Sequence, residues 1–358
     1  MRRPRIVVVT SGFPRVSETF ALGELLALDA QGLLGAVFAT KPGDGLPAQP
    51  GVDQLPQRVQ VLPPGSPAQQ AEAMLERLGG RPVGGFHGYF AHQPAAVAAA
   101  AARASGRRFG FSVHALDARK VPAPELTARA RAASVVVACN RDVADPVRQP
   151  GVPLRLIPHG VDLERFRPSQ PPGGPQIRLL AVGRLVLKKG LDVLVEAARR
   201  VEFHFLLEIV GGGPERERLE GAVRAAGLGD RVRLTGPVTH AELPGHYAAA
   251  DIVVVPSVVD RNGDRDGLPN VVLEAMASGR PVVASDVAAI GTAVAHRRSG
   301  LLVPPGDPDA LAAALTELAD APRLRAALGA AARRRVERDF DLERCTRRFG
   351  QALEEAYD

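Results

Sequence analysis

The chain has 358 residues, of which 46% are hydrophobic and 23% charged, with a mean hydropathy of −0.01. This length exceeds one ordinary hydrophobic core and favours two domains of a globular protein. Aromatic residues make up only 4%, Trp is absent, and no run reaches the ~18 apolar residues that span a bilayer. The composition therefore excludes a transmembrane helix and disfavours a nucleic-acid platform built on base stacking.

The positive charge is unevenly distributed along the chain. Residues 1–150 hold 17 Lys and Arg against 11 Asp and Glu, whereas residues 151–358 hold 28 of each, so the net +6 lies in the first part. A basic surface attracts anionic lipid or a phosphate-bearing acceptor. We therefore expect a cytoplasmic protein that associates peripherally with the inner face of the membrane. The alternative is a composition rich in arginine, 41 Arg against 4 Lys, that simply places Arg on solvated surfaces.

Neither the start of the chain nor its cysteines point to secretion. The apolar run 6–10 follows five residues of basic character, but it is shorter than the ~7–15 residues of a signal-peptide core. Cys139 and Cys345 are the two cysteines, and their separation is unlike a metal-ligand pair. Isolated thiols of this kind are typical of a reducing cytoplasm.

In chain order, residues 1–167 alternate short β-branched runs with helical patterns. The predicted strands are 5–10, 36–40, 59–62, 85–90, 108–114 and 135–138. The predicted helices are 18–31, 69–78, 95–104 and 125–132. Such alternation predicts a parallel sheet covered by helices on both faces. Ser17 is the expected N-cap of the first helix, and the Pro- and Gly-rich stretch 42–57 is an expected surface loop.

A second domain is predicted after a linker at residues 168–176, which are rich in Pro and Gly. The same alternation restarts in residues 177–339. The predicted strands there are 178–182, 203–210, 231–235, 252–255 and 281–284. The predicted helices are 191–200, 215–226, 241–249, 270–278, 309–319, 323–338 and a final one at 342–356. The predicted fold class is α/β, with two Rossmann-like, doubly wound parallel-sheet domains facing a cleft where ligands meet the carboxyl ends of the strands.

The stretch 266–279, DGLPNVVLEAMASG, is the most informative in the chain. A helix that begins near Asn270 and ends at Gly279 places Glu274 about one turn inside it and Asp266 on the preceding loop. The apolar neighbours predict that Glu274 is buried, where a carboxylate needs a partner. Free N–H groups around 268–271 form an anion site at the helix N-terminus. Two acids flanking an anion site suit a phosphorylated ligand with hydroxyls, such as a nucleotide sugar.

Two further loops of the second domain follow strands. Arg184 and Lys189 share the loop 183–190, where an arginine fork and a lysine charge can grip a diphosphate, although such residues are also common on a solvated surface. The turn 211–214, GGGP, allows close backbone approach, with Pro214 suited to the first helical position.

In the first domain, Gly12 follows the first strand and can let backbone approach a phosphate. His114 is the last residue of the predicted strand 108–114, and the carboxyl end of a strand is the end that faces ligand in this fold class. Alternatively, Gly12 is an ordinary turn glycine, and His114 is a structural histidine with no role in ligand binding. The remaining strand-end histidines form no H-E-x-x-H pattern, so no metal site and no cofactor are expected. They are His87, His92 and His159.

With these loops in place, the chain resembles glycosyltransferase family 4, a large family of retaining transferases with the two-domain GT-B fold. The resemblance covers nearly the whole chain. It is carried by IPHGVD at 157–162, AVGRLVLKKGLDVL at 181–194, IVGGGPERERLE at 209–220, DGLPNVVLEAMASGRPVVAS at 266–285 and LLVPPGD at 301–307. The N-terminal segments are similar to members found in exopolysaccharide and colanic-acid-type assembly. They are SGFPRVSETFALGELLAL at 11–28, HGYFA at 87–91 and FSVHALD at 111–117.

The resemblance implies transfer of a hexose-type sugar from a UDP- or GDP-sugar to a lipid-linked glycan or other polysaccharide acceptor, with retention and without a metal. Arg184 and Lys189 would hold the donor diphosphate, and Glu274 would accept hydrogen bonds from the ribose. Asp266 and His114 would lie beside the transferred sugar. The remaining donor contacts would come from Gly12, Gly267, Leu268, Pro269 and Asn270.

The chain departs from the family pattern at two positions. The family often has Glu where this chain has Asp266, and many relatives have a second histidine where Tyr89 stands, so no role is assigned to Tyr89. The resemblance also implies that the C-terminal helix, 340–358, crosses back onto the first domain.

Four other functions fit the sequence less well. A nicotinamide oxidoreductase needs G-x-G-x-x-G after a strand and an acid about 20 residues later, and neither half has both. A metal-dependent transferase could use Asp264 and Asp266 as an Asp-x-Asp pair, but no other ligand lies near them in sequence. A basic nucleic-acid-binding protein is disfavoured by the scarcity of aromatics. A related GT-B enzyme, such as a nucleotide-sugar epimerase or a phosphorylase, remains the closest alternative.

Overall fold

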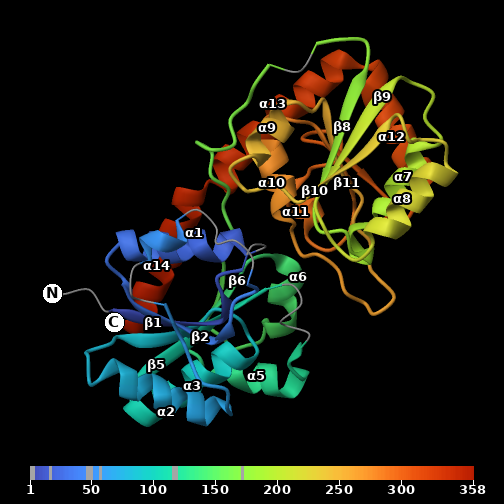
Figure 1. Ribbon diagram of the computed structural model, residues 1–358. Coiled ribbons are helices and arrows are strands. Elements are labelled where there is room, and N and C mark those ends of the chain that lie inside the picture. The colour runs from blue at the N-terminus through green and yellow to red at the C-terminus, as the bar shows by residue number, and fades with distance from the viewer. Residues whose placement is uncertain (1–4, 16–17, 46–50, 56–58, 115–119, 171–172) are drawn as a thin grey trace. The chain divides into compact units, whose positions relative to one another are not determined.

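The computed structural model describes residues 5–15, 18–45, 51–55, 59–114, 120–170 and 173–358. Ser17 and parts of the 42–57 stretch, for which we expected a helix cap and a surface loop, lie outside these residues. The chain divides into two compact units, Met1–Gly160 with Leu342–Asp358, and Val161–Asp341 (Figure 1). Each unit has its own parallel sheet with helices, so the predicted α/β class with two Rossmann-like parallel-sheet domains is confirmed.

The division falls after Gly160, before the proline-rich segment at 168–176 that we expected to separate the domains. Val161 forms a bridge to Asp341, and Phe166 is buried in the core of the second unit. Residues 161–167 therefore pack with the second sheet because their apolar side chains are buried there.

The first unit has a seven-stranded sheet in the order β3-β2-β1-β4-β5-β6-β7, in which every pair is parallel. The order reverses between β1 and β4, which makes that point the topological switch. The strands are β1 (Ile6–Phe13), β2 (Leu34–Pro42), β3 (Val59–Val61), β4 (Gly85–Gly88), β5 (Arg108–Val113), β6 (Val135–Ala138) and β7 (Leu154–Leu156). The longer helices are α1 (Thr19–Ala30), α2 (Pro67–Leu78), α3 (Gln93–Ser105), α5 (Ala123–Ala132) and α14 (Leu342–Tyr357), with the short α6 (Arg141–Ala144) after β6.

The last helix, α14, supplies part of the first unit's core and packs beside α1 (Figure 1). Its buried residues recur every three or four positions, as expected for an amphipathic helix. Phe349 and Leu353 are fully buried among residues of β1 and α1. Tyr357 donates a hydrogen bond to the Phe86 carbonyl at 3.0 Å, and its hydroxyl lies 3.0 Å from His87 Nδ1. The helix is therefore fixed both by apolar burial and by buried polar contacts.

The second unit has a six-stranded parallel sheet in the order β10-β9-β8-β11-β12-β13, and here the order reverses between β8 and β11. The strands are β8 (Ile177–Val182), β9 (Phe205–Val210), β10 (Val232–Gly236), β11 (Ile252–Val255), β12 (Val282–Ser285) and β13 (Leu301–Val303). The helices are α7 (Leu191–Ala198), α8 (Arg216–Ala225), α9 (Leu243–Ala248), α10 (Asn270–Ala277), α11 (Ile290–Ala293), α12 (Pro308–Asp320) and α13 (Pro322–Asp339).

The contribution of α14 can be measured by truncating one of its buried side chains. We expect Phe349→Ala to lower the free energy of unfolding of the first unit by about 3–5 kcal/mol, since it leaves a cavity in a packed core. Arg347→Ala, on the exposed side of the same helix, is the control and should change it by no more than about 0.5 kcal/mol. Urea unfolding followed by circular dichroism measures both. Equal losses for the two variants would contradict this packing role.

Candidate functional site

The candidate site of the second unit lies where the sheet order reverses, on the loops that follow β8 and β11. The backbones of these loops touch. Val258 N–H donates to the Lys188 carbonyl at 2.8 Å. Gly190 has φ +59°, and a Cβ there would lie 2.0 Å from the Pro256 carbonyl oxygen. A glycine is therefore required at 190 both for its left-handed backbone and for the close approach.

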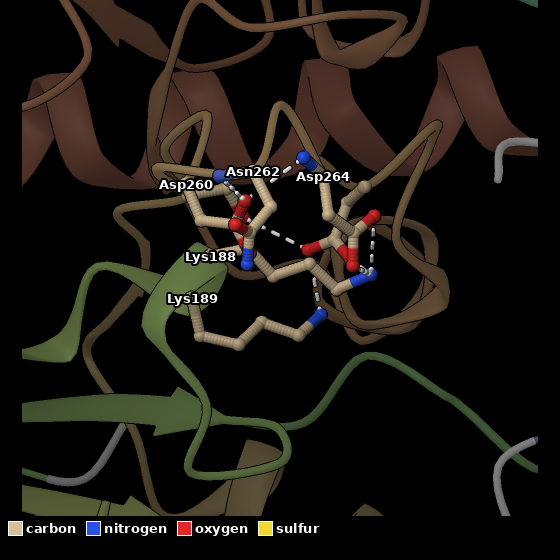
Figure 2. A network of polar contacts seen from close by, with 7 residues as sticks. Lys188, Lys189, Asp260, Asn262 and Asp264 are labelled. Atoms are coloured by element: carbon tan, nitrogen blue, oxygen red, sulfur yellow. Dashed lines mark hydrogen bonds and ion pairs between the residues drawn. The ribbon is translucent and has the colours of Figure 1, made fainter. Parts of the chain in front are cut away.

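Two lysines of the first loop pair with two aspartates of the second (Figure 2). Lys189 Nζ lies 2.7 Å from Asp266 Oδ2, and Lys188 Nζ lies 3.1 Å from Asp264 Oδ2 and 3.6 Å from Asp266 Oδ1. The Ser257 hydroxyl donates to Asp266 Oδ2 at 3.2 Å. These contacts define the lysine–aspartate cluster, which consists of Lys188, Lys189, Asp264, Asp266 and Ser257.

A tight turn before the cluster orients Asp264. Asp260 Oδ1 accepts hydrogen bonds from Asn262 N–H at 2.8 Å and Asp264 N–H at 2.9 Å, while the Asp260 N–H donates to the Asp264 carbonyl at 2.9 Å (Figure 2). Gly263 supplies the positive φ of +74° that this turn needs. The turn therefore presents the Asp264 carboxylate to Lys188.

The cluster keeps Asp266 ionised. Burial by itself raises the pKa of this carboxyl. The ammonium groups of Lys189 and Lys188 and the Ser257 hydroxyl lower the pKa by a larger amount, so the pKa lies below its ordinary value. The side chain of Asp266 is 12% exposed, close to solvent yet shielded by its partners. The site thus holds a fixed negative charge beside two lysine cations.

Glu274 is buried on α10, as the sequence predicts, and its partner is a tyrosine. Tyr247 donates to Glu274 Oε2 at 2.7 Å, whereas Glu274 Oε1 lies 3.7 Å from His240 Nε2, beyond hydrogen-bonding distance. Burial, together with the nearby Glu274 carboxyl, raises the pKa of Tyr247 well above its ordinary value, so the phenol remains a donor. Sequence reasoning missed Tyr247, because nothing in the pattern of α9 marks a residue that meets α10.

The remaining predicted donor residues of the second unit lie on the loops after β8 and β11 or at the start of α10. The N-cap of α10 is Pro269, whose side chain cannot accept a hydrogen bond from the N–H groups of the first turn. Gly267, Leu268 and Asn270 lead into that turn, and the N-terminal N–H groups give it positive character. Arg184 is exposed, and the described residues give its side chain no hydrogen bond or ion pair.

The glycine-rich turn after β9 is explained by packing. A Cβ on Gly211 would lie 1.8 Å from the Gly183 carbonyl oxygen, and one on Gly213 would lie 2.4 Å from the Leu185 carbonyl oxygen. Both glycines also have positive φ, of +145° and +159°. The turn therefore supports the backbone of the neighbouring loop that carries Arg184.

In the first unit, Gly12 lies within β1, and His114 follows β5. A Cβ on Gly12 would approach the Pro42 carbonyl oxygen to 2.6 Å, so the pairing of β1 with β2 already requires a glycine there. His114 is buried, and its ring packs against Tyr89 and His159, with both centroid distances at 5.1 Å. The sequence did not predict this cluster of rings.

Two other features bear on ligand binding. Over the described parts of the chain, no three His, Cys, Asp or Glu side chains gather in a way that could hold a metal ion, and no helix is long and apolar enough to cross a membrane. A cavity of about 580 Å³ lies at the opposite edge of the second sheet, lined by the starts of β8, β9 and β10. It is remote from the lysine–aspartate cluster, which follows the carboxyl ends of the strands.

Known proteins resemble both units. Residues 18–165 match the family described as Glycosyltransferase Family 4, and residues 176–321 match Glycosyl transferases group 1. The amylovoran biosynthesis glycosyltransferase AmsK of Erwinia amylovora is 34% identical over 209 residues, covering 57% of this chain and 51% of that protein. A GDP-mannose-dependent alpha-(1-6)-phosphatidylinositol monomannoside mannosyltransferase of Mycobacterium tuberculosis is 38% identical over 199 residues, covering 51% of each. The chain spans about half the length of these curated relatives.

The fold of the chain also resembles that of solved structures. The Anabaena protein HepE, solved in complex with UDP, superposes with a TM-score of 0.83 at 17% identity, covering 98% of this chain and 100% of that one. Two Rossmann-like parallel-sheet units with this likeness define the GT-B fold. Because the two family matches together extend over most of both units, the chain belongs to glycosyltransferase family 4, as its motifs predict.

The lysine–aspartate cluster leads to a stability prediction. Removing Lys189 leaves Asp266 with one fewer cation, so Lys189→Met should raise the pKa of Asp266 and lower the stability of the second unit by about 3 kcal/mol at pH 7. Because the pKa of Asp266 is lower in the folded than in the unfolded protein, its ionised form stabilises the fold at pH values above its ordinary pKa of 3.8. This stabilisation is lost as the pH falls through the pKa of the folded state. The difference between wild type and variant should therefore shrink on acidification.

Urea unfolding at a series of pH values measures this difference, and carboxyl NMR reports the pKa of Asp266. Arg338→Met, which breaks the exposed pair with Asp339, is the matched control and should cost at most about 1 kcal/mol. A loss for Lys189→Met that is constant from pH 7 down to the acid transition would show that the lysine does not act through a carboxylate.

Proposed function

We propose that the protein is a retaining glycosyltransferase that moves a sugar from a nucleotide diphosphate sugar to a glycan or lipid-linked glycan acceptor. The observation that carries the proposal is the lysine–aspartate cluster at the switch point of the second sheet, on the loop that leads into the start of α10. A fixed anion, two lysines and a helix N-terminus suit a ligand with both phosphates and hydroxyls.

The donor diphosphate is assigned to Lys189, Arg184 and the first turn of α10. Arg184 is exposed and able to form a bidentate contact with phosphate. Lys189 is paired with Asp266, so a diphosphate would share or displace that ammonium group. Helix N–H groups complete a positive environment without a metal ion.

The ribose of the donor is assigned to Glu274. Its Oε2 is occupied by Tyr247, while Oε1 lies too far from His240 for a hydrogen bond. One carboxylate oxygen is therefore available to accept a ribose hydroxyl, and the tyrosine fixes the rotamer of the side chain. This arrangement favours binding of the nucleoside rather than a step in the chemistry.

In the proposed reaction, the bond between the anomeric carbon and the diphosphate oxygen breaks, and the acceptor oxygen forms the new bond on the same face. The proton of the acceptor hydroxyl passes to the leaving diphosphate, so no protein nucleophile takes part. The anomeric carbon gains positive character as its bond stretches. The ionised Asp266 stabilises that charge, and the lysines stabilise the diphosphate as it leaves.

The relatives support a nucleotide-sugar donor without fixing its base. HepE was solved with UDP, and the Mycobacterium tuberculosis relative depends on GDP-mannose and acts on a phosphatidylinositol monomannoside. AmsK takes part in amylovoran biosynthesis. A lipid-linked or polysaccharide acceptor, reached from the cytoplasmic face through the basic residues 1–150, agrees with these relatives, and nucleic acid is not proposed as a partner.

A panel of donors tests the proposal directly. We expect one or more UDP-, GDP- or ADP-sugars to raise the melting temperature in EDTA, since the site binds phosphate through side chains and N–H groups. With that donor and a suitable acceptor, the product should keep the anomeric configuration of the donor. The absence of stabilisation by every donor, or a product with inverted configuration, would refute the proposal. Binding restored only by Mg²⁺ or Mn²⁺ would contradict its metal independence.

The two acids should have separable effects on kinetics. Asp266→Asn should lower kcat by about 100-fold with donor affinity nearly unchanged, because its charge acts on the transition state. Glu274→Gln should weaken donor binding by about tenfold with a smaller change in kcat, because it removes binding energy from ground and transition states alike. Glu317→Gln, on the surface of the same unit, is the matched control. Asp266→Asn acting only on donor affinity would show that the roles are misassigned.

A further inference from the structure

A second group of polar side chains lies at the carboxyl edge of the first sheet, outside the donor residues of the second unit. Glu24 on α1 is 6% exposed, and both of its oxygens are bonded. His159 Nδ1 lies 2.7 Å from Glu24 Oε1, and the Tyr89 hydroxyl donates to Glu24 Oε2 at 2.5 Å. Three elements distant in sequence thus converge on one buried carboxylate.

The His159 ring is also stacked on His114. The two rings are parallel within 2°, with centroids 5.1 Å apart. Phe20 packs on the His159 ring at 4.3 Å, and Phe90 packs on His114 at 5.0 Å. The aromatic neighbours bury the His114 ring, leave the His159 side chain 15% exposed, and hold the two imidazoles face to face.

The two imidazoles differ in charge. Burial lowers the pKa of His159, but the Glu24 carboxylate and the Cys139 side chain outweigh burial and raise it to about 10. Burial and the neighbouring His159 lower the pKa of His114 well below its ordinary value. At neutral pH the pair is therefore an imidazolium on a neutral imidazole.

Among the described residues, the other titratable side chains near this pair are two histidines, a tyrosine and a glutamate. Burial lowers the pKa of His87 to about 3 and that of His92 to about 4, so neither carries charge at neutral pH. Burial and Glu24 raise the pKa of Tyr89, which remains a phenol. Glu18, at the start of α1, faces Tyr89, and burial raises its pKa. Among these groups, Glu24 is the carboxylate that contacts His159.

We propose that Glu24 and His159 form a positioning pair that holds the His114 imidazole neutral and oriented to hydrogen-bond a hydroxyl of a carbohydrate substrate. The charge on His159 opposes a second charge on the stacked ring, and the shared stack fixes the plane of that ring. A neutral imidazole can accept a hydrogen bond from a hydroxyl, whereas an imidazolium can only donate. The inference rests on the proposed glycosyl transfer only in naming the ligand as a carbohydrate.

The protonation states can be measured without any substrate. In the wild-type protein, NMR of histidines labelled at Cε1 should show His159 protonated through neutral pH and His114 neutral over the same range. Glu24→Gln keeps the hydrogen-bonding shape but removes the countercharge. His159 should then lose its proton at lower pH, and His114 should take up a proton more easily.

The same variant should alter the pH dependence of catalysis. For Glu24→Gln, kcat/KM should fall by about tenfold between pH 8 and pH 6 as His114 becomes protonated, whereas the wild type should keep a nearly constant value. Tyr89→Phe is the matched control, since it removes a hydrogen bond to Glu24 but leaves the ion pair. It should keep both histidine titrations and the flat profile.

Two outcomes would overturn the inference. One is a wild-type His159 that titrates near pH 6.5, and the other is a His114 titration that is the same in Glu24→Gln as in the wild type. If Glu24→Gln does not fold, His159→Asn removes the charge directly and should raise the pH at which His114 titrates. Histidines that titrate as expected in a protein that binds no nucleotide sugar would refute the proposed function and leave the positioning pair intact.

Discussion

The second unit depends on one electrostatic constraint, the pairing of two lysines from the β8 loop with two aspartates from the β11 loop. Like charges lie next to each other on each loop, so neither loop would be stable alone in a partly buried position. Their combination at the sheet's switch point neutralises both, and the backbone contact at Gly190 brings them close enough to pair. Removing any one of the four leaves its partner partly buried and less well compensated.

Asp266 contacts Lys188 and Ser257 as well as Lys189. Its orientation therefore does not depend only on Lys189, the lysine that we assign to the donor diphosphate. A diphosphate can attract Lys189 while the remaining contacts hold the carboxylate in place. The first unit repeats the principle with a different pair, a buried Glu24 matched to His159. In both units a charge near the carboxyl edge of the sheet is kept by a partner from a distant part of the chain.

Much of this arrangement could be predicted from the sequence, and the limit has a physical cause. Strands such as β6 and β11 were predicted to the residue or nearly so, because buried β-branched runs are local signals. The strands β7, with the sequence LRL, and β13, with LLV, were missed because their leucines give no β-branched run of the kind that marked the other strands. Asp266, Lys189 and Glu274 were recognised from motifs, and the structure brings the first two together. Tyr247, Ser257 and the Glu24–His159 pair were not, because their contacts join residues whose separation along the chain carries no periodic pattern.

The position of α14 has a consequence for the order in which the protein folds during synthesis. The second unit is a continuous segment, and all of its strands are translated before α14. The first unit is made earlier, yet the pocket for Phe349 and Leu353 is filled only when the last helix arrives. The unit that is translated first is therefore completed last, and until then it exposes an apolar surface beside α1 that a chaperone would recognise.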